Sequence, residues 1–344
     1  MWTMHNNKKK QSEKLEILMN KLPDFCDSYM KARALKISLS TSISYANDFL
    51  TFFYFLIRKS HYYKDYKPKD FKISDLNGLT VEDIDAFIQD QQQNDNVKTS
   101  IYRRLSAIST LYDYLLKRRL VSHNPVTLVE RKKENKKPVI HLEDDESERF
   151  LATISTGTGL TNREKSRTPI LIRDMAIFVM FLNNGFRISE LQSIDIKDIN
   201  FDGHYVGIIR KGGDYQRIYL ADTTEDIIKR YLDIRKEFIK EDMLPEDKDA
   251  LFLSQKGNRI SVRQIQTLTK KYLGKSVPEK MDIITPHKLR STFAMDYYAI
   301  TQDVLSLQKI LGHSNIQTTN IYAQATENSI RDTRNVIERK RIYE

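Results

Sequence analysis

The chain has 344 residues, of which 40% are hydrophobic, so it is long enough to form two domains with sizeable cores. Its formal net charge of +10 favours a polyanionic partner, although a basic balance alone also fits many proteins that bind no nucleic acid. Cys26 is the only cysteine, which excludes an internal disulfide and a zinc site built from several cysteines.

The N-terminal segment is basic and polar and lacks the apolar core of a secretory signal. The most hydrophobic stretch, residues 49–57, is too short to cross a bilayer. We therefore expect a cytoplasmic protein with no membrane partner.

Residues 1–130 are predicted to form a small helical bundle with polar turns. Apolar residues recur at helical spacing, with a break near Pro23 and a capping box formed by Thr80 and Asp83, and the expected helices cover residues 15–30, 40–57, 80–92 and 99–117. Their aromatic residues are expected to be core. Arg103 and Arg104 lie off the apolar face of the last helix, and either DNA contact or a solvated surface fits them.

Residues 131–140 form a charged run with a proline, which predicts an interdomain linker. Its Lys132 and Lys133 are candidate DNA contacts. Beyond it, helices are expected over residues 142–154, 169–182, 223–240 and 261–272, with a polar loop over residues 157–168. The apolar run 251–253 is assigned to neither helix nor strand.

A small three-stranded antiparallel sheet is expected between residues 198 and 220. Two strand-like runs, 204–210 and 215–220, are joined by Lys211-Gly212-Gly213-Asp214, which is typical of a hairpin turn. Lys211 would lie at its tip. Upstream, Arg187 follows an apolar helix and a glycine turn.

Thr285 and Pro286 predict a helix that starts at His287, because serine-like caps and a first-position proline favour helix starts. His287 and Arg290 are three residues apart on one face, which we expect to point out of the core.

A second helix is expected over residues 302–311, where Gly312 would end it. His313 lies just beyond this end. Ser314 then begins a third helix by a capping-box pattern, and that helix would present Tyr322 near His313.

Together these motifs resemble the tyrosine recombinase (phage integrase) family, in its Xer-like branch, over nearly the whole sequence. The resemblance rests on Gly-Phe-Arg187-Ile-Ser-Glu190-Leu, the hairpin lysine, His287-x-x-Arg290, Leu-Gly-His313, and a tyrosine nine residues after His313. It implies a catalytic set of Arg187, Lys211, His287, Arg290, His313 and Tyr322. Ser291 stands where many relatives carry histidine, outside that set.

Elementary chemistry accounts for these residue types. Breaking a phosphodiester without water or metal requires a nucleophile, charge stabilisation and a proton for the departing 5′ oxygen. The phenol of Tyr322 can supply the nucleophile, with the bond energy kept for rejoining. Arg187 and Arg290 can approach the non-bridging oxygens with planar forks of donors, and His313 can add a third donor. No metal or nucleotide cofactor is needed.

Three roles follow less directly. Lys211 is the candidate general acid, although a solvated turn lysine is the alternative and the adjacent Arg210 could be confused with it. His287 can assist proton transfer from Tyr322. Glu190 either orients this neighbourhood or is a first-turn acid stabilised by the helix dipole.

The resemblance further implies a SAM-like, core-binding helical bundle over residues 1–130 and a mostly helical catalytic domain over residues 141–326. A final helix over residues 327–344 would pack on a neighbouring protomer or on its own domain. The expected partner is double-stranded DNA, bound by a homotetramer on two recombination sites, with a DNA translocase or an excisionase as a possible accessory protein.

The leading hypothesis is a site-specific recombinase that works through a 3′-phosphotyrosyl intermediate, in Xer-type chromosome-dimer resolution at a dif-like site. An integrase or excisionase-type recombinase of a phage or conjugative element is the alternative. A type IB topoisomerase and a catalytically inactive DNA-binding protein are weaker alternatives, because the box spacing and the complete six-residue set argue against them.

Overall fold

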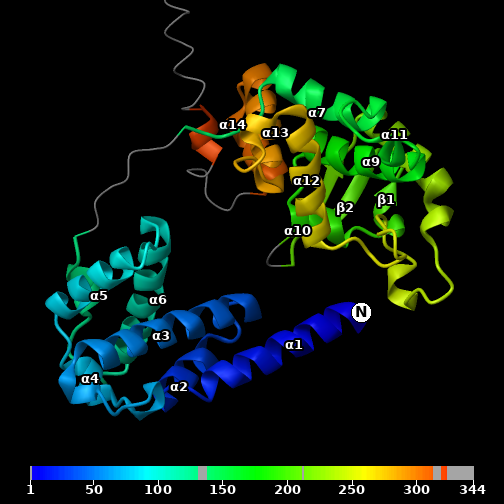
Figure 1. Ribbon diagram of the computed structural model, residues 1–344. Coiled ribbons are helices and arrows are strands. Elements are labelled where there is room, and N and C mark those ends of the chain that lie inside the picture. The colour runs from blue at the N-terminus through cyan, green and yellow to red at the C-terminus, as the bar shows by residue number, and fades with distance from the viewer. Residues whose placement is uncertain (1, 131–137, 211–212, 313–318, 324–344) are drawn as a thin grey trace, which may run out of the picture. The chain divides into compact units, whose positions relative to one another are not determined.

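The structure is a computed structural model that describes residues 2–130, 138–210, 213–312 and 319–323. The chain divides into two compact units, Met1–Asn135 and Lys136–Glu344 (Figure 1). Helices dominate both units, and the sheet among the described residues has three antiparallel strands, which confirms the predicted fold class. Within these described ranges, no helix is long and apolar enough to cross a membrane.

The N-terminal unit is a helical bundle. Its helices are α1 (Trp2–Met19), α2 (Asp24–Arg33), α3 (Leu39–Lys59), α4 (Ile73–Asn77), α5 (Val81–Gln93) and α6 (Lys98–Lys117). The predicted break near Pro23 is confirmed, because Pro23 is the N-cap of α2. The predicted capping box also forms, since the backbone N–H of Thr80 donates to Asp83 Oδ2 at 2.9 Å.

Aromatic side chains fill the core of this unit, as the helical spacing predicts. Phe49, Phe53 and Phe87 are buried on α3 and α5. Tyr112 on α6 is buried as well, and its hydroxyl donates to the carbonyl oxygen of Leu76 at 2.9 Å. These rings are therefore packing groups.

The C-terminal unit is built around α9, which is apolar on almost every side. Its helices are α7 (Asp144–Thr156), α8 (Asn162–Lys165), α9 (Thr168–Asn184), α10 (Ile188–Ser193), α11 (Asp222–Ile234), α12 (Val262–Ser276), α13 (Pro286–Thr301) and α14 (Val304–Leu311). Figure 1 shows α9 among α7, α11 and α13, which all pack against it. Residues 319–323 form a further helical turn.

Three predicted boundaries in this unit are wrong. The expected polar loop 157–168 contains the short helix α8, and α11 ends at Ile234, where a 3₁₀ turn over Arg235–Phe238 replaces its last turns. Gln302 does not begin α14 but ends α13 in a left-handed conformation with φ 53°. The side chain of Asp303 then caps α14 by accepting a hydrogen bond from Ser306 N at 3.0 Å.

The predicted sheet is confirmed, with strand order β1 (Ile199–Asn200), β2 (Tyr205–Ile209) and β3 (Tyr215–Tyr219). Val206 pairs with Ile218, and both face the core, so that the sheet buries one side and exposes the other. The unassigned run 251–253 is buried and forms only an isolated bridge, from Leu253 to Arg259.

Candidate active site

The turn after α9 places Arg187. Gly185 ends the helix with φ 61°, and a methyl group on it would overlap the ring of Phe293 on α13. Only glycine fits both conditions without strain. Arg187 is the N-cap of α10, and its backbone N–H donates to Glu190 Oε2 at 2.8 Å, which forms a capping box.

Arg290 is buried, contrary to the prediction that it points out of the core. It is 1% exposed, and Nη1 donates to the carbonyl oxygen of Gly185 at 2.6 Å while Nη2 donates to that of Leu311. Both acceptors lie at C-terminal helix ends, where unpaired carbonyls and the helix dipole favour a cation. These two helix ends are the reason that a charged side chain is stable inside the unit.

Glu190 connects three arginines. Its Oε1 accepts from Arg187 Nη1 at 2.7 Å and from Arg210 Nη1 at 2.8 Å, and its Oε2 lies 3.6 Å from Arg290 Nη1. We call these four residues the arginine–glutamate cluster. One acid against three guanidinium groups leaves the cluster with a net positive charge, which suits an oxyanion such as phosphate.

Burial by itself would raise the pKa of Glu190. The hydrogen bonds from Arg187 and the charges of Arg210 and Arg290 outweigh this effect, so that the pKa lies below its ordinary value. Glu190 is 6% exposed and is therefore a buried, ionised group at neutral pH. It orients the arginines and caps α10 at once, so both readings of its role in the sequence apply.

Tyr322 lies in the helical turn 319–323 and is 5% exposed. It packs against Phe293 and Ala294 of α13 and Leu307 and Leu311 of α14. The candidate nucleophile therefore packs on α13, the helix that carries Arg290, and on α14.

The pKa of Arg290 is lowered in this environment. Burial lowers it most, followed by the charge of Arg187, while Glu190 and the Tyr322 phenol act in the opposite direction, and the result is about 9. Arg290 is thus still a cation at neutral pH, and the phenol of Tyr322 lies within its electrostatic range.

His287 lies at the surface beside the cluster, one turn before Arg290. Partial shielding of its imidazole lowers its pKa first, and the positive charges of Arg290, Lys288 and Arg187 lower it further. At neutral pH the imidazole is therefore uncharged and able to accept a proton.

Four candidate residues lie outside the described residues: Lys211, His313, Lys132 and Lys133. The residues next to two of them are described. Arg210 precedes Lys211 and belongs to the arginine–glutamate cluster, and Gly312, which ends α14 with φ 58°, precedes His313. The sequence analysis named Arg210 as a residue that could be confused with Lys211, but it did not predict the contacts of Arg210 with Glu190 and α14, which depend on the tertiary fold.

Arg103 and Arg104 have partners inside the N-terminal unit. Arg103 holds the buried carboxylate of Asp48 with both terminal nitrogens, one of them at 2.7 Å, and Arg104 donates to Gln91. The Arg103 side chain is still 48% exposed, so these contacts leave the alternative of a solvated surface open. A DNA contact from them stays a prediction.

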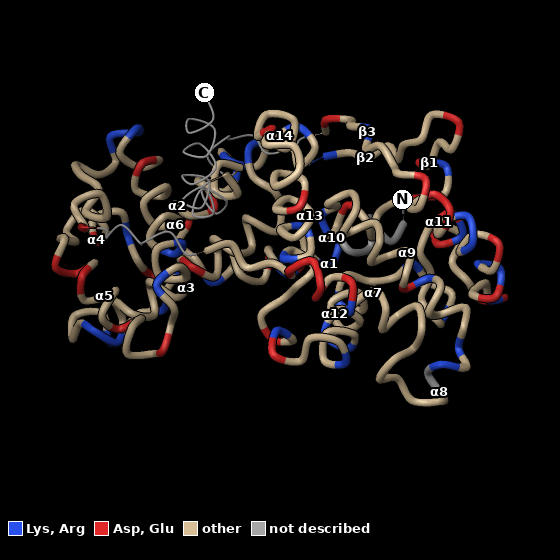
Figure 2. Tube along the Cα trace, turned by 90° about the horizontal axis from the view of Figure 1, so that it is seen from above, with Lys and Arg blue, Asp and Glu red and all other residues tan. Residues whose placement is uncertain are grey.

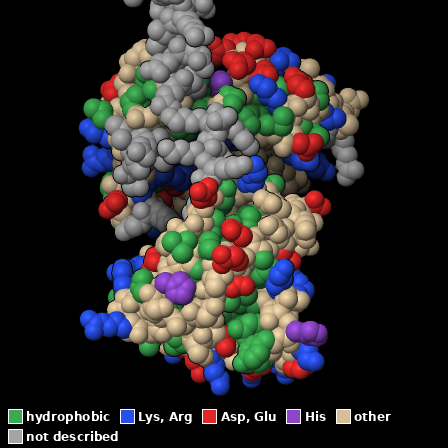
Figure 3. Space-filling view, turned by 90° about the vertical axis from the view of Figure 1, so that its left-hand side faces the viewer, with side chains coloured by type: hydrophobic (Ala, Val, Ile, Leu, Met, Phe, Trp, Pro, Cys, Tyr) green, Lys and Arg blue, Asp and Glu red, His purple; other side chains and the backbone are tan. Residues whose placement is uncertain are grey.

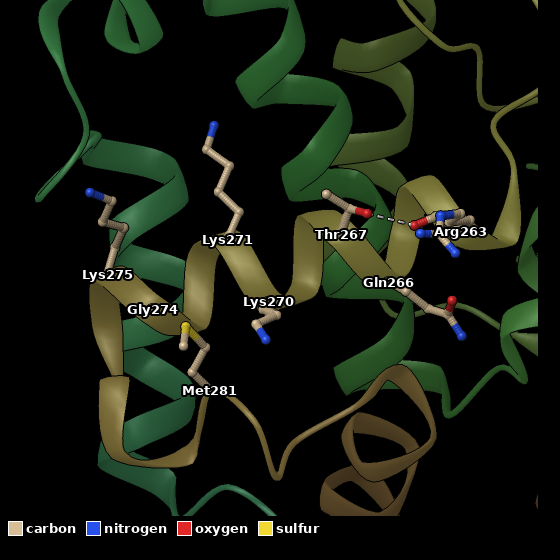
Figure 4. Close-up of a pocket in the computed structure, with 8 residues that line it drawn as sticks. All are labelled: Arg263, Gln266, Thr267, Lys270, Lys271, Gly274, Lys275 and Met281. Carbon is tan, nitrogen blue, oxygen red and sulfur yellow. Dashed lines mark hydrogen bonds between the residues drawn. The ribbon is translucent and has the colours of Figure 1, made fainter.

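A second basic feature lies on α12, away from the cluster. A groove of about 590 Å³ is lined by α12 residues and Met281, and it includes none of the candidate catalytic residues. Figure 4 shows Lys271 and Lys275 extending from one side of the helix and Lys270 from the other. Basic residues recur along α12 in Figure 2 as well. By contrast, the face of the N-terminal unit turned to the viewer in Figure 3 mixes basic, acidic and apolar side chains.

Comparison with known proteins identifies the class. Residues 141–329, more than half of the chain, match the phage integrase family. The chain belongs to this family, and it is a tyrosine recombinase, an enzyme of site-specific DNA recombination.

Its relatives carry Xer names. The chain is 32% identical to the tyrosine recombinase XerC of Caldanaerobacter subterraneus subsp. tengcongensis, over 97% of this chain and 91% of the relative. It is 29% identical to the tyrosine recombinase XerS of Streptococcus pyogenes serotype M2, over 90% of this chain and 94% of the relative.

Two solved structures share the fold. The Tn1549 transposon integrase in complex with circular intermediate DNA has a TM-score of 0.64 at 18% identity, covering 87% of this chain and 94% of that one. The XerH recombinase bound to palindromic difH substrate has a TM-score of 0.64 at 20% identity, covering 90% and 83%. The fold is therefore common to Xer and transposon recombinases.

Proposed function

We propose that this enzyme cleaves and rejoins DNA strands through a 3′-phosphotyrosyl intermediate in which Tyr322 is the nucleophile. The observation that carries the proposal is the joining of Arg187 and Arg290 through Glu190, with the buried Tyr322 packed on α13, the helix that carries Arg290. A cationic cluster beside a phenol is what phosphoryl transfer to tyrosine requires.

In this mechanism the phenolate oxygen of Tyr322 bonds to phosphorus as the bond from phosphorus to the 5′ oxygen breaks. Arg187 and Arg290 stabilise the charge on the non-bridging oxygens. The Arg187 side chain is 33% exposed, and among the described contacts it uses two of its five N–H donors, so it can meet the phosphate first. Arg290 then contributes from the buried side of the cluster.

Proton transfer involves His287 and Lys211. The uncharged imidazole of His287 is suited to take the phenolic proton of Tyr322, since its pKa is held down. Lys211 protonates the departing 5′ oxygen, and His313 donates a further hydrogen bond to the phosphate. The roles of Lys211 and His313 rest on their places in the sequence motifs.

Double-stranded DNA is the proposed partner, as in the complexes of the Tn1549 integrase and XerH. The net charge of +10 supports it, and so does α12, whose side chains Arg263, Lys271 and Lys275 line the basic groove. Lys270 also lines this groove and is paired with Asp282 at 2.5 Å. Arg103, Arg104, Lys132 and Lys133 are proposed as further contacts.

The proposed biological role is Xer-type chromosome-dimer resolution at a dif-like site by a homotetramer on two sites. The XerC and XerS relatives support it. An integrase of a mobile element stays the alternative, because the Tn1549 integrase matches the fold as well as XerH does. An accessory DNA translocase would accompany the first role and an excisionase the second. Residues 327–344 are proposed to pack on a neighbouring protomer.

Incubation with a nicked suicide duplex that carries the candidate site tests the chemistry. The wild type should form a covalent 3′ adduct, and Tyr322→Phe should bind the duplex without forming one. Tyr297→Phe is the matched control, because Tyr297 packs in the same α13 and α14 cluster as Tyr322 and should leave the adduct yield intact. Equal adduct from the Tyr322 variant would remove this residue from its role.

A plasmid assay tests the biological role. Recombination between two identical dif-like sites supports the Xer role, whereas recombination only between a pair of unlike attachment sites supports the integrase alternative. Relaxation of a supercoiled plasmid that carries no site would instead indicate topoisomerase activity.

A further inference from the structure

We propose that Arg210 is a positioning residue for the cleavage step. It fastens the base of the β2–β3 hairpin to the arginine–glutamate cluster and to the end of α14, and it thereby sets where Lys211, the next residue, can reach. The proposal rests on the proposed role of Lys211 as general acid, and it adds a residue outside the catalytic set.

The contacts of Arg210 run to three segments: Glu190 of α10, the end of α14 and the neighbouring strand β3. Its Nη1 donates to Glu190 Oε1 at 2.8 Å and to the carbonyl oxygen of Leu311 at 3.1 Å, and its Nη2 donates to that of Ile310 at 2.6 Å. Its Nε donates to Gln216 Oε1 on β3 at 2.7 Å. One side chain thus joins the hairpin, the cluster and α14.

The hairpin has a second attachment that depends on the first. Gln216 Nε2 donates to the carbonyl oxygen of Lys309 at 2.7 Å, while its Oε1 accepts from Arg210. At the hairpin end, the backbone N–H of Arg210 donates to Asp214 O at 2.8 Å, and Gly213 N donates to Arg210 O at 3.0 Å. The base of the hairpin is therefore fixed on both strands.

The end of α14 is shaped to receive Arg210. A methyl group on Gly312 would lie 2.8 Å from Arg210 Nε, so the guanidinium lies directly against this glycine. The last carbonyls of α14 also carry the negative end of the helix dipole, which favours a cation there. A lysine could not reach these acceptors together, because it lacks the planar fork of donors.

Arg210 is unsuited to bind the phosphate itself. It is 8% exposed, and among the described residues its partners already take four of its five N–H donors. Arg187, in comparison, is 33% exposed and uses two. Arg210 therefore acts by positioning the hairpin and not by direct stabilisation of the transition state.

The expected size of the effect follows from general-acid catalysis. A general acid must come within hydrogen-bond reach of the leaving oxygen, and a misplacement of about 1 Å can cost roughly 100-fold in rate. Without Arg210 the hairpin loses its link to the cluster, and among the described residues the bond from Gln216 to Lys309 is left as its side-chain link to α14. We expect cleavage to slow by about 10- to 100-fold, with little change in affinity for DNA.

A sulfur substitution in the substrate isolates this step. When the bridging 5′ oxygen is replaced by sulfur, the 5′ thiolate leaves without a proton, because a thiol has a pKa of about 8.5. Cleavage of the oxygen and sulfur duplexes is compared for the wild type, Arg210→Gln, Lys211→Ala and Arg187→Ala. We expect Arg210→Gln and Lys211→Ala to be slow on oxygen and to recover to within a few-fold of the wild type on sulfur, whereas Arg187→Ala stays slow on both.

Comparison of these variants on the two duplexes shows which of the two proposed roles is wrong, that of Lys211 or that of Arg210. If Lys211→Ala does not recover on sulfur, the proposed role of Lys211 is wrong, whatever Arg210 does. If Lys211→Ala recovers but Arg210→Gln is slow on both substrates, or fast on both, the inference about Arg210 is overturned.

Two further variants keep the proposal testable if Arg210→Gln fails to fold. Gln216→Ala removes the bond to Lys309 and one contact of Arg210 but leaves the contacts of Arg210 with Glu190, Ile310 and Leu311. It should therefore show the same oxygen-specific loss at smaller size, and equal rates on both substrates would contradict the inference. Arg217→Gln is the matched control on β3, where Arg217 lies exposed over the ring of Tyr205, and it should cleave both duplexes as the wild type does.

Discussion

Replacement of Glu190 by glutamine tests the charge balance of the arginine–glutamate cluster. The amide keeps the shape of the side chain and can still accept the backbone N–H of Arg187 that lies 2.8 Å from Oε2. What it removes is the negative charge that faces Arg187, Arg210 and Arg290. The variant therefore leaves buried cations without their acid.

The magnitude follows from the burial of each partner. Removing one partner of a buried ion pair costs about 3–5 kcal/mol. The Arg187 side chain is 33% exposed, so solvent screens its share, and the helix-end carbonyls still solvate Arg210 and Arg290. We expect a loss of about 3 kcal/mol, which for a unit of this size lowers its Tm by roughly 6–12 °C.

Calorimetry of the full chain measures this loss, with Glu146→Gln as control. Glu146 occupies the same capping-box position in α7, where it accepts a hydrogen bond from Glu143 N at 2.8 Å, but among the described residues its ion-pair partner is Lys280 alone. It should lose about 1 kcal/mol. Added sulfate should recover more of the loss in Glu190→Gln, because an uncompensated arginine cluster binds an oxyanion. Equal losses in the two variants, with no difference in sulfate, would refute the charge argument and leave Glu190 as a simple cap.

The pH dependence gives a second check of the same variant. The pKa of Glu190 is lowered in the folded chain, so its contribution to stability is complete above the unfolded value of about 4.3. It is lost as pH falls through the folded pKa. The difference between the wild type and Glu190→Gln should therefore be constant near neutral pH and shrink as pH falls below the unfolded value of about 4.3.

Three further variants test the surroundings of the site. Arg103→Ala should lower the free energy of unfolding of the N-terminal unit, measured in urea, by about 1–2 kcal/mol. Asp48 is 2% exposed, and the variant removes the guanidinium that donates to both of its carboxylate oxygens. An unchanged urea midpoint would contradict this. Gly185→Ala should lower the free energy of unfolding by at least about 2 kcal/mol and slow cleavage. The φ of Gly185 is 61°, and the added methyl group would overlap the ring of Phe293. Normal stability and a normal cleavage rate would show that α13 can move to make room for the methyl group. His287→Gln should lose less stability than the wild type between pH 7.5 and 5.5. The folded pKa of His287 is below the unfolded value, so protonation of the wild type in this range favours unfolding. Identical pH profiles of stability for the two proteins would contradict this prediction.

Local patterns in the sequence were sufficient for most of the fold. The capping box at Thr80, the glycine ends of α9 and α14, and the hairpin between β2 and β3 all depend on residues close together in the chain. Periodicity also located the buried faces of α3 and α6. Features of this kind can be predicted without knowing which helix or strand packs against the segment.

The burial of Arg290 could not be obtained in this way. Residues Leu289 to Ala294 of α13 are all buried, whether polar or apolar, so the helix has no polar face that periodicity could detect. What stabilises the arginine is a pair of carbonyls 105 and 21 residues away. The partners of Arg103 and Arg210 are equally remote in sequence, 55 residues away at Asp48 and 101 at Leu311, which explains why neither pairing was predicted.

These remote contacts share one acceptor region, and this has a mechanical consequence. Arg187, Arg210 and Arg290 donate to the carbonyls of Gly312, Ile310 and Leu311 at the end of α14, and Tyr322 packs against Leu307 and Leu311 of the same helix. A shift of α14 therefore moves the candidate nucleophile and the acceptors of all three arginines together. Because each arginine also binds Glu190 or lies near it, such a shift must break charge-assisted hydrogen bonds at several points at once. The end of α14 therefore contributes to the position of the three arginines and of the candidate nucleophile.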